Sequence, residues 1–433
     1  MINLNYNNRN IYVLLLCFIP FFLITGPFIP DLIVVISAIL FIKINTNKMI
    51  IIDNRLLKIF FYIFLLFWIV SIISSLLSSH QLYSLRSSVF YIRFVFFVFF
   101  FYYVLNQSPD KLTKYLFDII FYSFLILFVY SCYEFFSNLN FFLEKSKFNN
   151  PRLSSLFFDE KILGSYCVRI LPIFVGIFFF RIYKGYKVNP FKLIIIFPVI
   201  LMIFLSAERT SFALLLLFFV LSFFLMQSCR KNLNILFLLT LIFFGILFSF
   251  ETGAKKRLIH ETIRQVGFND NKFNVFSVQH QAHYESAIKM FKNNKFFGVG
   301  PKNFRKECNK DIYKVVYQRK NIDLYELIDN KYESACSTHP HNTYIQLLAE
   351  TGIIGFLFIS IFFLIVSYYL VRVYFMKIFH KKHTPDYAIF FMICVFLNFW
   401  PIVPTGNFFN NWISIIYFFP FGFLLYFFNK NKS

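Results

Sequence analysis

The chain has 433 residues, of which 58% are hydrophobic and only 15% are charged. This balance excludes an ordinary soluble domain and predicts a protein that crosses a membrane many times. The formal net charge of +22 would suit a nucleic-acid-binding protein, but the basic residues are scattered over the loops between apolar runs, which is typical of orientation signals in membrane proteins. We therefore expect membrane lipids as surroundings and no nucleic-acid partner.

Twelve apolar runs predict an all-α fold, a polytopic bundle of about twelve transmembrane helices. On this prediction residues 1–250 hold the first nine spans, residues 251–342 form one large extramembrane loop, and residues 343–433 hold the last three spans. The expected spans are 11–25, 28–44, 57–77, 89–105, 115–136, 162–180, 191–206, 210–227, 233–250, 343–371, 386–403 and 409–428.

The short loops indicate the orientation of the chain. If the N-terminus is cytoplasmic, the inside segments hold nineteen Lys and Arg residues and the short outside loops hold six. Because cytoplasmic loops are enriched in basic residues, this orientation is favoured. The loop 251–342 then lies outside the cytoplasm, which in a bacterial inner membrane means the periplasm.

Three features mark the loop 251–342. Apolar residues recur at helical spacing from Tyr284 onward and predict an amphipathic helix over His280–Asn294. The stretch Gly298–Phe304, GVGPKNF, predicts an ordered turn. Cys308 and Cys336 share the loop, and an extracytoplasmic location would allow them to form a disulfide.

A polar cluster closes this loop at the start of the tenth predicted span, in the sequence HPHNTYIQLLAETGIIGF, residues 339–356. Asn342 or Thr343 is expected to cap the helix that follows. His341 would then be held at a helix end, where an imidazole with an ordinary pKa near 6.5 is suited to act as a general base at neutral pH. His339 has the simpler interpretation of a loop residue, with a possible supporting role beside His341.

Arginines in the outward half of the predicted bundle form the second candidate group. Arg209 lies in LSAERTS between two spans, Arg257 follows the ninth span, and Arg152 precedes the sixth. Arg86 and Arg93 lie at the start of the fourth span. Because arginine cannot lose its charge, such residues need anionic partners in the membrane. If they converge, they would bind a diphosphate through charge-assisted hydrogen bonds.

Each of these candidates also has a structural interpretation. Arg209 would simply pair with Glu208 or with another carboxylate, and Arg257 would anchor a helix end at the membrane surface. His280 and His283, three residues apart on a helix, would ligate a metal ion together with His339 or His341, but spacing alone is a weak signal for a metal site. We expect neither a metal ion nor a cofactor.

The arrangement around His341 resembles a known family signature. His341 and Asn342 are followed by nine residues, then Gly352, two residues and Gly355, and two small residues three apart would let a neighbouring helix approach closely. Spacing and position both resemble the signature of the O-antigen ligase and polymerase superfamily, with an O-antigen ligase-related domain over roughly residues 191–365. Sharp agreement is confined to the stretches Gly298–Phe304 and His339–Gly355.

The resemblance implies a membrane glycosyltransferase that needs no metal ion or cofactor. The donor would be a glycan on undecaprenyl diphosphate and the acceptor lipid A-core, as in cell-surface polysaccharide biosynthesis. By position, His341 would be the catalytic base, and Arg209 and Arg257 would bind the lipid diphosphate, with Arg152 beside them and Arg86 in support. A single direct displacement would invert the anomeric centre of the donor sugar.

Other functions remain open at this point. A polymerase that joins lipid-linked repeat units would share the domain and the histidine, with a second lipid-linked glycan as acceptor, and a linked enzyme with a protein acceptor is a further variant. A transporter of lipid-linked glycans should show an internal repeat, and none is evident in the sequence. A purely structural membrane protein would leave the polar cluster at residues 339–356 unexplained.

Overall fold

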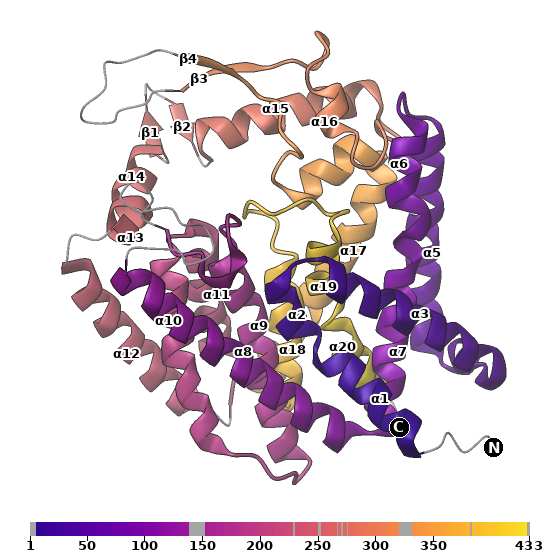
Figure 1. Cartoon of the computed structure of the whole chain (residues 1–433), viewed down its shortest axis with the longest axis vertical. Helices are drawn as coiled ribbons and strands as arrows, with labels where there is room; N and C mark the ends of the chain where they lie inside the picture. The colour runs from indigo at the N-terminus through magenta and orange to yellow at the C-terminus, as the bar shows by residue number, and fades with distance from the viewer. Residues whose placement is uncertain are drawn as a thin grey trace.

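The computed structural model is built almost entirely from helices, which pack side by side in one bundle (Figure 1). It describes residues 6–137, 152–227, 230–249, 253–265, 267–269, 272–274, 276–319, 331–381 and 383–430. The helices before residue 250 are α1 (Tyr6–Cys17), α2 (Ile19–Thr25), α3 (Phe28–Lys48), α4 (Ile50–Asp53), α5 (Arg55–Leu76), α6 (Gln81–Ser88), η1 (Val89–Ile92), α7 (Arg93–Gln107), α8 (Pro109–Ser137), η3 (Ser155–Phe157), α9 (Leu163–Tyr183), η4 (Pro190–Ile195), α10 (Ile196–Leu205), α11 (Arg209–Leu225) and α12 (Arg230–Ser249).

The remaining elements include two short hairpins. They are α13 (Gly253–Lys255), η5 (Lys256–His260), α14 (Glu261–Gln265), β1 (Gly267–Asn269), β2 (Lys272–Asn274), α15 (Val278–Asn293), α16 (Phe304–Glu307), β3 (Val316–Arg319), β4 (Lys331–Ser334), α17 (Thr343–Phe379), α18 (Asp386–Asn398), α19 (Asn411–Phe418) and α20 (Phe421–Lys430). Strands β1 and β2 pair antiparallel, and so do β3 and β4.

Several helices meet the length and apolarity expected of membrane spans. Within the described residues seven pass this test, or up to eight if Ile235–Ser249 and Gly253–Ile263 form one broken span. This supports a multi-pass membrane protein. Every predicted span overlaps a helix, but three of the apolar helices, 190–205, 209–225 and 386–398, are shorter, and the first predicted span is divided into α1 and α2. The count of twelve therefore stays a prediction.

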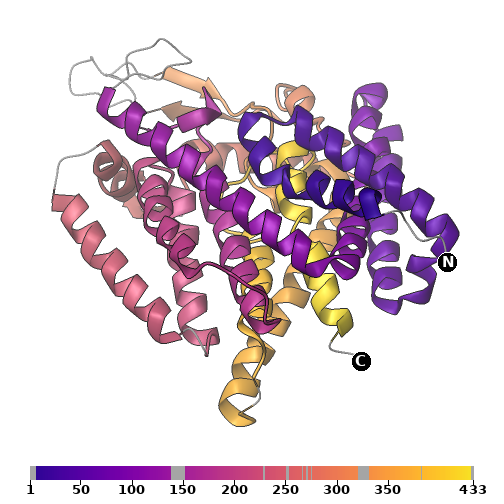
Figure 2. The ribbon, with the colours of Figure 1, turned by 60° about the horizontal axis from the view of Figure 1, so that its bottom comes forward.

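The elements from α14 to β4 lie together at one end of the bundle in both views (Figures 1 and 2). The predicted amphipathic helix is confirmed as α15, which packs against α17 and β3. Its buried face includes Tyr284, Ala287 and Met290, whereas Ile288, expected on the same face, is exposed. The described parts of segment 253–340 thus cover the end of the bundle where α17 begins.

The turn Gly298–Phe304 is docked on the first part of α17. Backbone hydrogen bonds join Val299 N to Ala349 O and Gly300 N to Glu350 O, both at 2.9 Å. At Gly352, α17 is interrupted by a positive φ of 67°, and a Cβ there would collide with the backbone of Phe296. The segment that approaches this glycine is therefore a turn, and the expectation of a neighbouring helix at this point was wrong.

Aromatic side chains fill the core between α5, α7, α17 and the C-terminal helices. Phe67 on α5 stacks on Phe358 of α17 with ring centroids 4.1 Å apart, and Phe391 of α18 stacks on Phe423 of α20 at 4.2 Å. Such pairs add about 0.5–1.5 kcal/mol each beyond the burial of their area. This packing holds α17, and with it the loop that precedes it, in a fixed position.

Candidate functional site

His341 lies directly before α17, on a loop held at both sides. Asn342 is the N-cap of α17, since its side-chain oxygen accepts hydrogen bonds from Tyr344 N at 3.0 Å and Ile345 N at 3.1 Å, as the sequence predicted. The backbone carbonyl of His341 accepts a hydrogen bond from Thr405 N at 2.9 Å. His341 itself has a φ of 59°, a left-handed conformation that is uncommon outside glycine.

Three further imidazole rings surround His341. Its ring centroid lies 4.1 Å from that of His339, 5.4 Å from that of His283 and 5.5 Å from that of His280. His280 and His283 come from α15 and the other two rings from the loop before α17. The packing of α15 against α17 therefore brings together four histidines that are about 60 residues apart in the sequence.

The hydrogen bonds of the four rings differ. His339 uses both ring nitrogens, with Thr338 Oγ1 at 2.8 Å and Thr405 O at 3.1 Å, and His283 Nδ1 lies 2.8 Å from Ala335 O. The ring of His341 forms no hydrogen bond within the part of the chain that the structure describes. Its two nitrogens are therefore available to a substrate, whereas His339 holds the loop in place.

The surroundings change the protonation of these rings. Burial, together with the nearby His283, lowers the pKa of His341 from 6.5 to about 4. Burial also lowers the pKa of His280 to about 4 and that of His339 to about 3, with His341 acting in the same direction on both. All three rings are thus neutral at pH 7, the form in which an imidazole accepts a proton. The ordinary pKa expected for His341 from the sequence does not hold in this environment.

The histidine cluster is not arranged as a metal site. Among the described residues, no group of three or more His, Cys, Asp or Glu side chains has a geometry that could hold a metal ion. His283 Nδ1 and both nitrogens of His339 already lie at hydrogen-bonding distance from other groups. The alternative of a metal bound by His280, His283 and a third ring therefore gains no support from this geometry.

In the reversal LSAERTS before α11, the two charged residues, Glu208 and Arg209, contact different parts of the protein. The carboxylate of Glu208 accepts hydrogen bonds from Gly164 N at 2.7 Å and from Ser165 Oγ at 2.8 Å, so it fixes the start of α9. Arg209 instead reaches Glu261 on α14, with 3.5 Å between Nη2 and Oε2. The same carboxylate oxygen lies 3.8 Å from Nη1 of Arg257. One carboxylate thus joins the two arginines predicted to bind a diphosphate.

Arg152 lies beside this pair. Its Nε donates to Ser206 O at 3.3 Å and its Nη2 to Lys161 O at 3.2 Å, which attaches it to the same reversal. Burial lowers the pKa of Arg152, and the positive charges of Arg257 and Arg209 act in the same direction. Arg152, Arg209 and Arg257, called here the arginine cluster, therefore lie close enough for their positive charges to interact.

The arginine cluster is electrostatically linked to the histidines. The charge of Arg209 contributes to the lowered pKa of His280, whose ring lies 5.5 Å from that of His341. A site of this kind presents fixed positive charge on one side and a neutral imidazole on the other. Such a pair of features can hold an anionic leaving group while a base takes a proton from the attacking group.

Residues 194–360 match the family model of the O-antigen ligase. This segment of the chain is similar to the O-antigen ligase domain. The match supports the resemblance to the O-antigen ligase superfamily, and the matched segment includes His341, Arg209, Arg257 and the histidines of α15. No curated protein is similar enough to the chain to be matched.

The matched segment also contains the two loop cysteines. Cys308 and Cys336 form a disulfide with 5.1 Å between their Cα atoms. The bond joins the end of α16 to the segment just before His339. It thereby restricts the motion of the loop that carries His339 and His341.

Arg86, expected to support the diphosphate-binding arginines, lies away from the arginine cluster. It lines a cavity with Arg93 and Lys302, and none of the arginine cluster lines that cavity. Arg93 forms an ion pair there with Asp31, with 2.8 Å between Nη2 and Oδ1. This pairing explains why two charged residues occur in otherwise apolar helices. The structure thus separates the predicted arginines into two groups.

Four residues of the site were missed or given another role by sequence reasoning. Glu261 carries no motif, and only its position one helical turn after Arg257 hinted at the contact. Thr405 lies in a loop far along the chain, and nothing in its neighbourhood marks it. His280 and His283 were recognised as a pair on a helix, but their spacing suggested a metal site and not that their rings would pack against His341.

Proposed function

We propose that this chain is an inner-membrane glycosyltransferase that moves a glycan from undecaprenyl diphosphate to lipid A-core. The observation that carries the proposal is the neutral ring of His341, free of hydrogen bonds within the described residues and adjacent to His280, on which the charge of Arg209 acts. The O-antigen ligase match over residues 194–360 supports a ligase or polymerase role in polysaccharide biosynthesis.

In this mechanism His341 accepts the proton of the acceptor hydroxyl as its oxygen attacks the anomeric carbon of the donor sugar. The bond from that carbon to the diphosphate oxygen breaks, and the diphosphate leaves with the bonding electrons. Arg209 and Arg257, with Arg152 beside them, stabilise the charge that develops on the leaving group. Because a diphosphate leaves readily, the scheme uses no general acid and no metal ion, and one displacement inverts the anomeric centre.

The topology belongs to the same proposal. We place the N-terminus in the cytoplasm, about twelve spans in the membrane, and the loop 251–342 with the site in the periplasm, with residues 1–250 and 343–433 as the two helical parts. The excess of basic residues in the inside segments supports this orientation. Labelling of the variants Arg230→Cys and Lys289→Cys with a membrane-impermeant thiol reagent would test it. We expect Cys at position 289 to react from the periplasmic side and Cys at position 230 to react only from the cytoplasmic side.

A reconstituted assay tests the function. The donor is an undecaprenyl-diphosphate glycan, and the acceptor is either lipid A-core or excess donor. We expect transfer to lipid A-core that resists EDTA and falls at least ~100-fold in His341→Ala, as removal of a general base predicts. The matched control is His80→Gln, which removes an exposed imidazole that lies outside the cluster.

The acceptor decides between the two related functions. Chain growth with donor alone, lost in His341→Ala, would make the protein a polymerase with the same catalytic group. Activity that survives in His341→Ala would overturn the mechanism with either acceptor. A transporter would move lipid-linked glycan across vesicles without forming any new glycosidic bond.

A further inference from the structure

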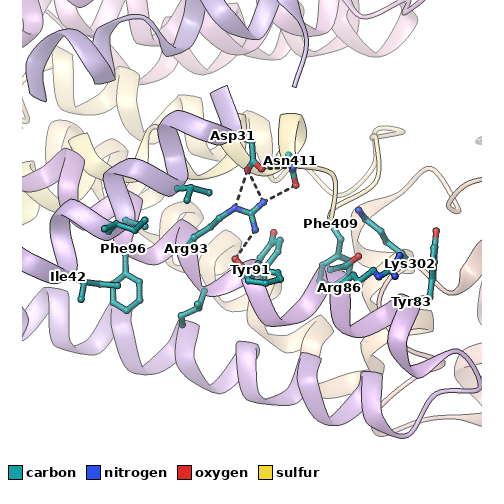
Figure 3. A pocket seen from close by; sticks show the side chains of 16 residues that line it. Asp31, Ile42, Tyr83, Arg86, Tyr91, Arg93, Phe96, Lys302, Phe409 and Asn411 are labelled. Atoms are coloured by element: carbon teal, nitrogen blue, oxygen red, sulfur yellow. Dashed lines mark hydrogen bonds and ion pairs between the residues drawn. The ribbon is translucent and has the colours of Figure 1, made fainter. Parts of the chain in front are cut away.

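A cavity of about 600 Å³ lies between α3, the α6–α7 segment and the turn Gly298–Phe304 (Figure 3). Neither the histidine cluster nor the arginine cluster lines it. We call it the amphiphilic groove, because apolar and cationic side chains occupy different ends of it. It is thus separate from the site described above.

One end of the groove is apolar and faces outward from the bundle. Ile39 and Ile42 on α3 are 61% and 45% exposed, and Phe96 on α7 lies beside Ile42 (Figure 3). Both isoleucines belong to the candidate membrane span Phe28–Thr46. This end of the groove is therefore suited to hold a hydrocarbon chain from the surrounding membrane.

The opposite end carries two cations, Arg86 and Lys302, whose side chains form no direct contact with an anion in the described residues. Arg86 and the ammonium group of Lys302 form no hydrogen bond or ion pair within the described part of the chain. Between the two ends, Arg93 is satisfied by Asp31, to which Nε donates at 3.1 Å and Nη2 at 2.8 Å. The carboxylates of Asp31 and Glu350 act on the charge of Lys302 from a distance, but neither forms an ion pair with Arg86 or Lys302 within the described residues.

The fold holds these two cations in place. Lys302 has a φ of 62°, and its backbone N donates to Glu350 Oε2 at 3.0 Å. Ser84, two residues before Arg86 on α6, donates to Pro301 O at 2.9 Å. Burial lowers the pKa of Lys302, and the charge of Arg305 acts in the same direction, whereas the carboxylates of Glu350 and Asp31 act against it. An anion in the groove would relieve this penalty, because it would favour the charged ammonium group.

A short segment joins the groove to the catalytic loop. Thr405 binds the loop through its contacts with His341 O and His339 Nε2, and Phe409 lines the groove. Four residue steps of extended chain span at most about 14 Å. A head group held in the groove therefore lies within reach of His341 for a ligand that extends by a few sugar units.

We propose that the amphiphilic groove binds the acceptor of the transfer reaction, a membrane lipid whose phosphate-bearing head group lies against Arg86 and Lys302. Its hydrocarbon chain lies against Ile39, Ile42 and Phe96, and its sugars extend toward His341. The groove and the arginine cluster thereby separate acceptor and donor. The identity of the ligand as acceptor depends on the proposed function, whereas binding of an anionic lipid does not.

Lipid binding to the purified full-length protein tests the groove without any assay of activity. After delipidation in mild detergent, native mass spectrometry measures the affinity for phosphatidylglycerol, for diacylglycerol with the same chains, and for inorganic phosphate. We expect phosphatidylglycerol to bind at least tenfold more tightly than either other probe. Arg86→Gln/Lys302→Gln should weaken phosphatidylglycerol binding at least tenfold and leave diacylglycerol binding unchanged.

Two controls complete this experiment. Lys184→Gln/Lys187→Gln removes two exposed cations away from the groove and should change neither affinity. Ile39→Trp fills the apolar end and should weaken binding of both lipids. Equal phosphatidylglycerol affinity in the groove variant and in the wild type would overturn the proposal, as would inorganic phosphate that binds as tightly as the lipid.

An activity readout then tests the acceptor role. In the reconstituted reaction, Arg86→Gln/Lys302→Gln should raise the KM for the lipid acceptor about tenfold, with the KM for the donor unchanged. A rise in the donor KM alone would assign the groove to the donor and overturn this role. Absence of all transfer by the wild-type protein, with lipid binding intact, would count against the proposed function and leave the lipid site standing.

Discussion

The carboxylate of Glu350, fully buried in α17, accepts a hydrogen bond from the backbone N of Lys302 at 3.0 Å. It also accepts from Phe304 N at 3.2 Å, so one side chain satisfies two backbone groups of the turn Gly298–Phe304. Gln346 Nε2 donates to the same carboxylate at 2.9 Å and to Asn407 Oδ1 at 3.0 Å. Glu350 therefore connects the turn, α17 and the segment after α18.

Glu350→Gln should destabilise the protein, because the amide nitrogen cannot accept the hydrogen bonds that the second carboxylate oxygen accepts. Leaving a buried donor unsatisfied costs about 1–3 kcal/mol. Thermal unfolding in detergent should show a lower midpoint for this variant than for the wild type. Glu285→Gln, which changes an exposed carboxylate on α15, is the matched control and should leave the midpoint unchanged. Equal midpoints for the two variants would show that Glu350 does not hold the turn.

The left-handed backbone at His341 predicts a difference between two substitutions that both remove the ring. Glycine adopts a φ near 59° readily, whereas alanine does not, so His341→Gly should be the more stable variant by about 1 kcal/mol. Neither variant should transfer glycan above background. Thermal unfolding measures the first effect and the reconstituted assay the second. A more stable alanine variant would mean that the loop changes its backbone conformation when the ring is removed.

The sequence predicted the parts of the site that follow from local rules. Helix spacing predicted α15, and the Asn342 cap is confirmed, since both depend on residues a few positions apart. The division of labour between Glu208 and Arg209 depends on which helix lies opposite each side chain. No local pattern contains that information. For the same reason the partner of Gly352 was predicted incorrectly, since a turn and a helix can both approach a residue without a side chain.

The chemistry of His341 was predicted less well than its position. A histidine at a helix end suggests an ordinary pKa, but two rings from α15 and one from its own loop bury it and lower its pKa to about 4. The spacing of His280 and His283 in the sequence does not show what they face. Tertiary packing, and not the motif, sets the electrostatics of this group.

Glu261 predicts how the donor gains access to the arginines. Its carboxylate lies 3.5 Å from Arg209 and 3.8 Å from Arg257, so a diphosphate must compete with it. Glu261→Gln should therefore tighten the binding of undecaprenyl diphosphate several-fold. Arg209→Gln should weaken it ten- to a hundredfold, since a charge-assisted contact contributes about 1.5–3 kcal/mol. Titration with undecaprenyl diphosphate measures both, and weaker binding in Glu261→Gln would show that this residue positions the arginines instead.

The disulfide predicts a specific pattern of thiol reactivity. In the non-reduced protein Cys308 and Cys336 should resist maleimide labelling even after unfolding, and both should react once a reductant is added. Closing a loop of 28 residues stabilises a fold by about 3.6 kcal/mol in the chain-entropy model, so Cys308→Ser/Cys336→Ser should unfold more easily. Labelling of both cysteines in the unfolded, non-reduced protein would contradict the bond. Cys167→Ser, which changes a buried free cysteine, is the matched control for labelling.

The lowered pKa values predict how activity depends on pH. Because kcat/KM reports on the free enzyme, its acid limb should lie near pH 4, the value for His341, and transfer should stay nearly constant from pH 7 down to about pH 5. His283→Gln should move the limb to higher pH, because His283 contributes to the lowered pKa of His341. His80→Gln is the control and should leave it in place. An acid limb near 6.5 in the wild type would show that a different group, or a more exposed His341, takes the proton.

The same values predict a loss of stability in acid. The folded pKa values of His280, His339 and His341 lie below the 6.5 of an unfolded histidine, so the unfolded chain binds more protons as the pH falls. The stability that the neutral rings allow is fully present above pH 6.5 and is lost as the pH falls toward 4. Unfolding midpoints measured from pH 7.5 to 4.5 should therefore decrease, and less steeply in His280→Gln. Because an unfolded protein is also inactive, the acid limb of kcat/KM is read only where activity returns after the sample is brought back to pH 7.5.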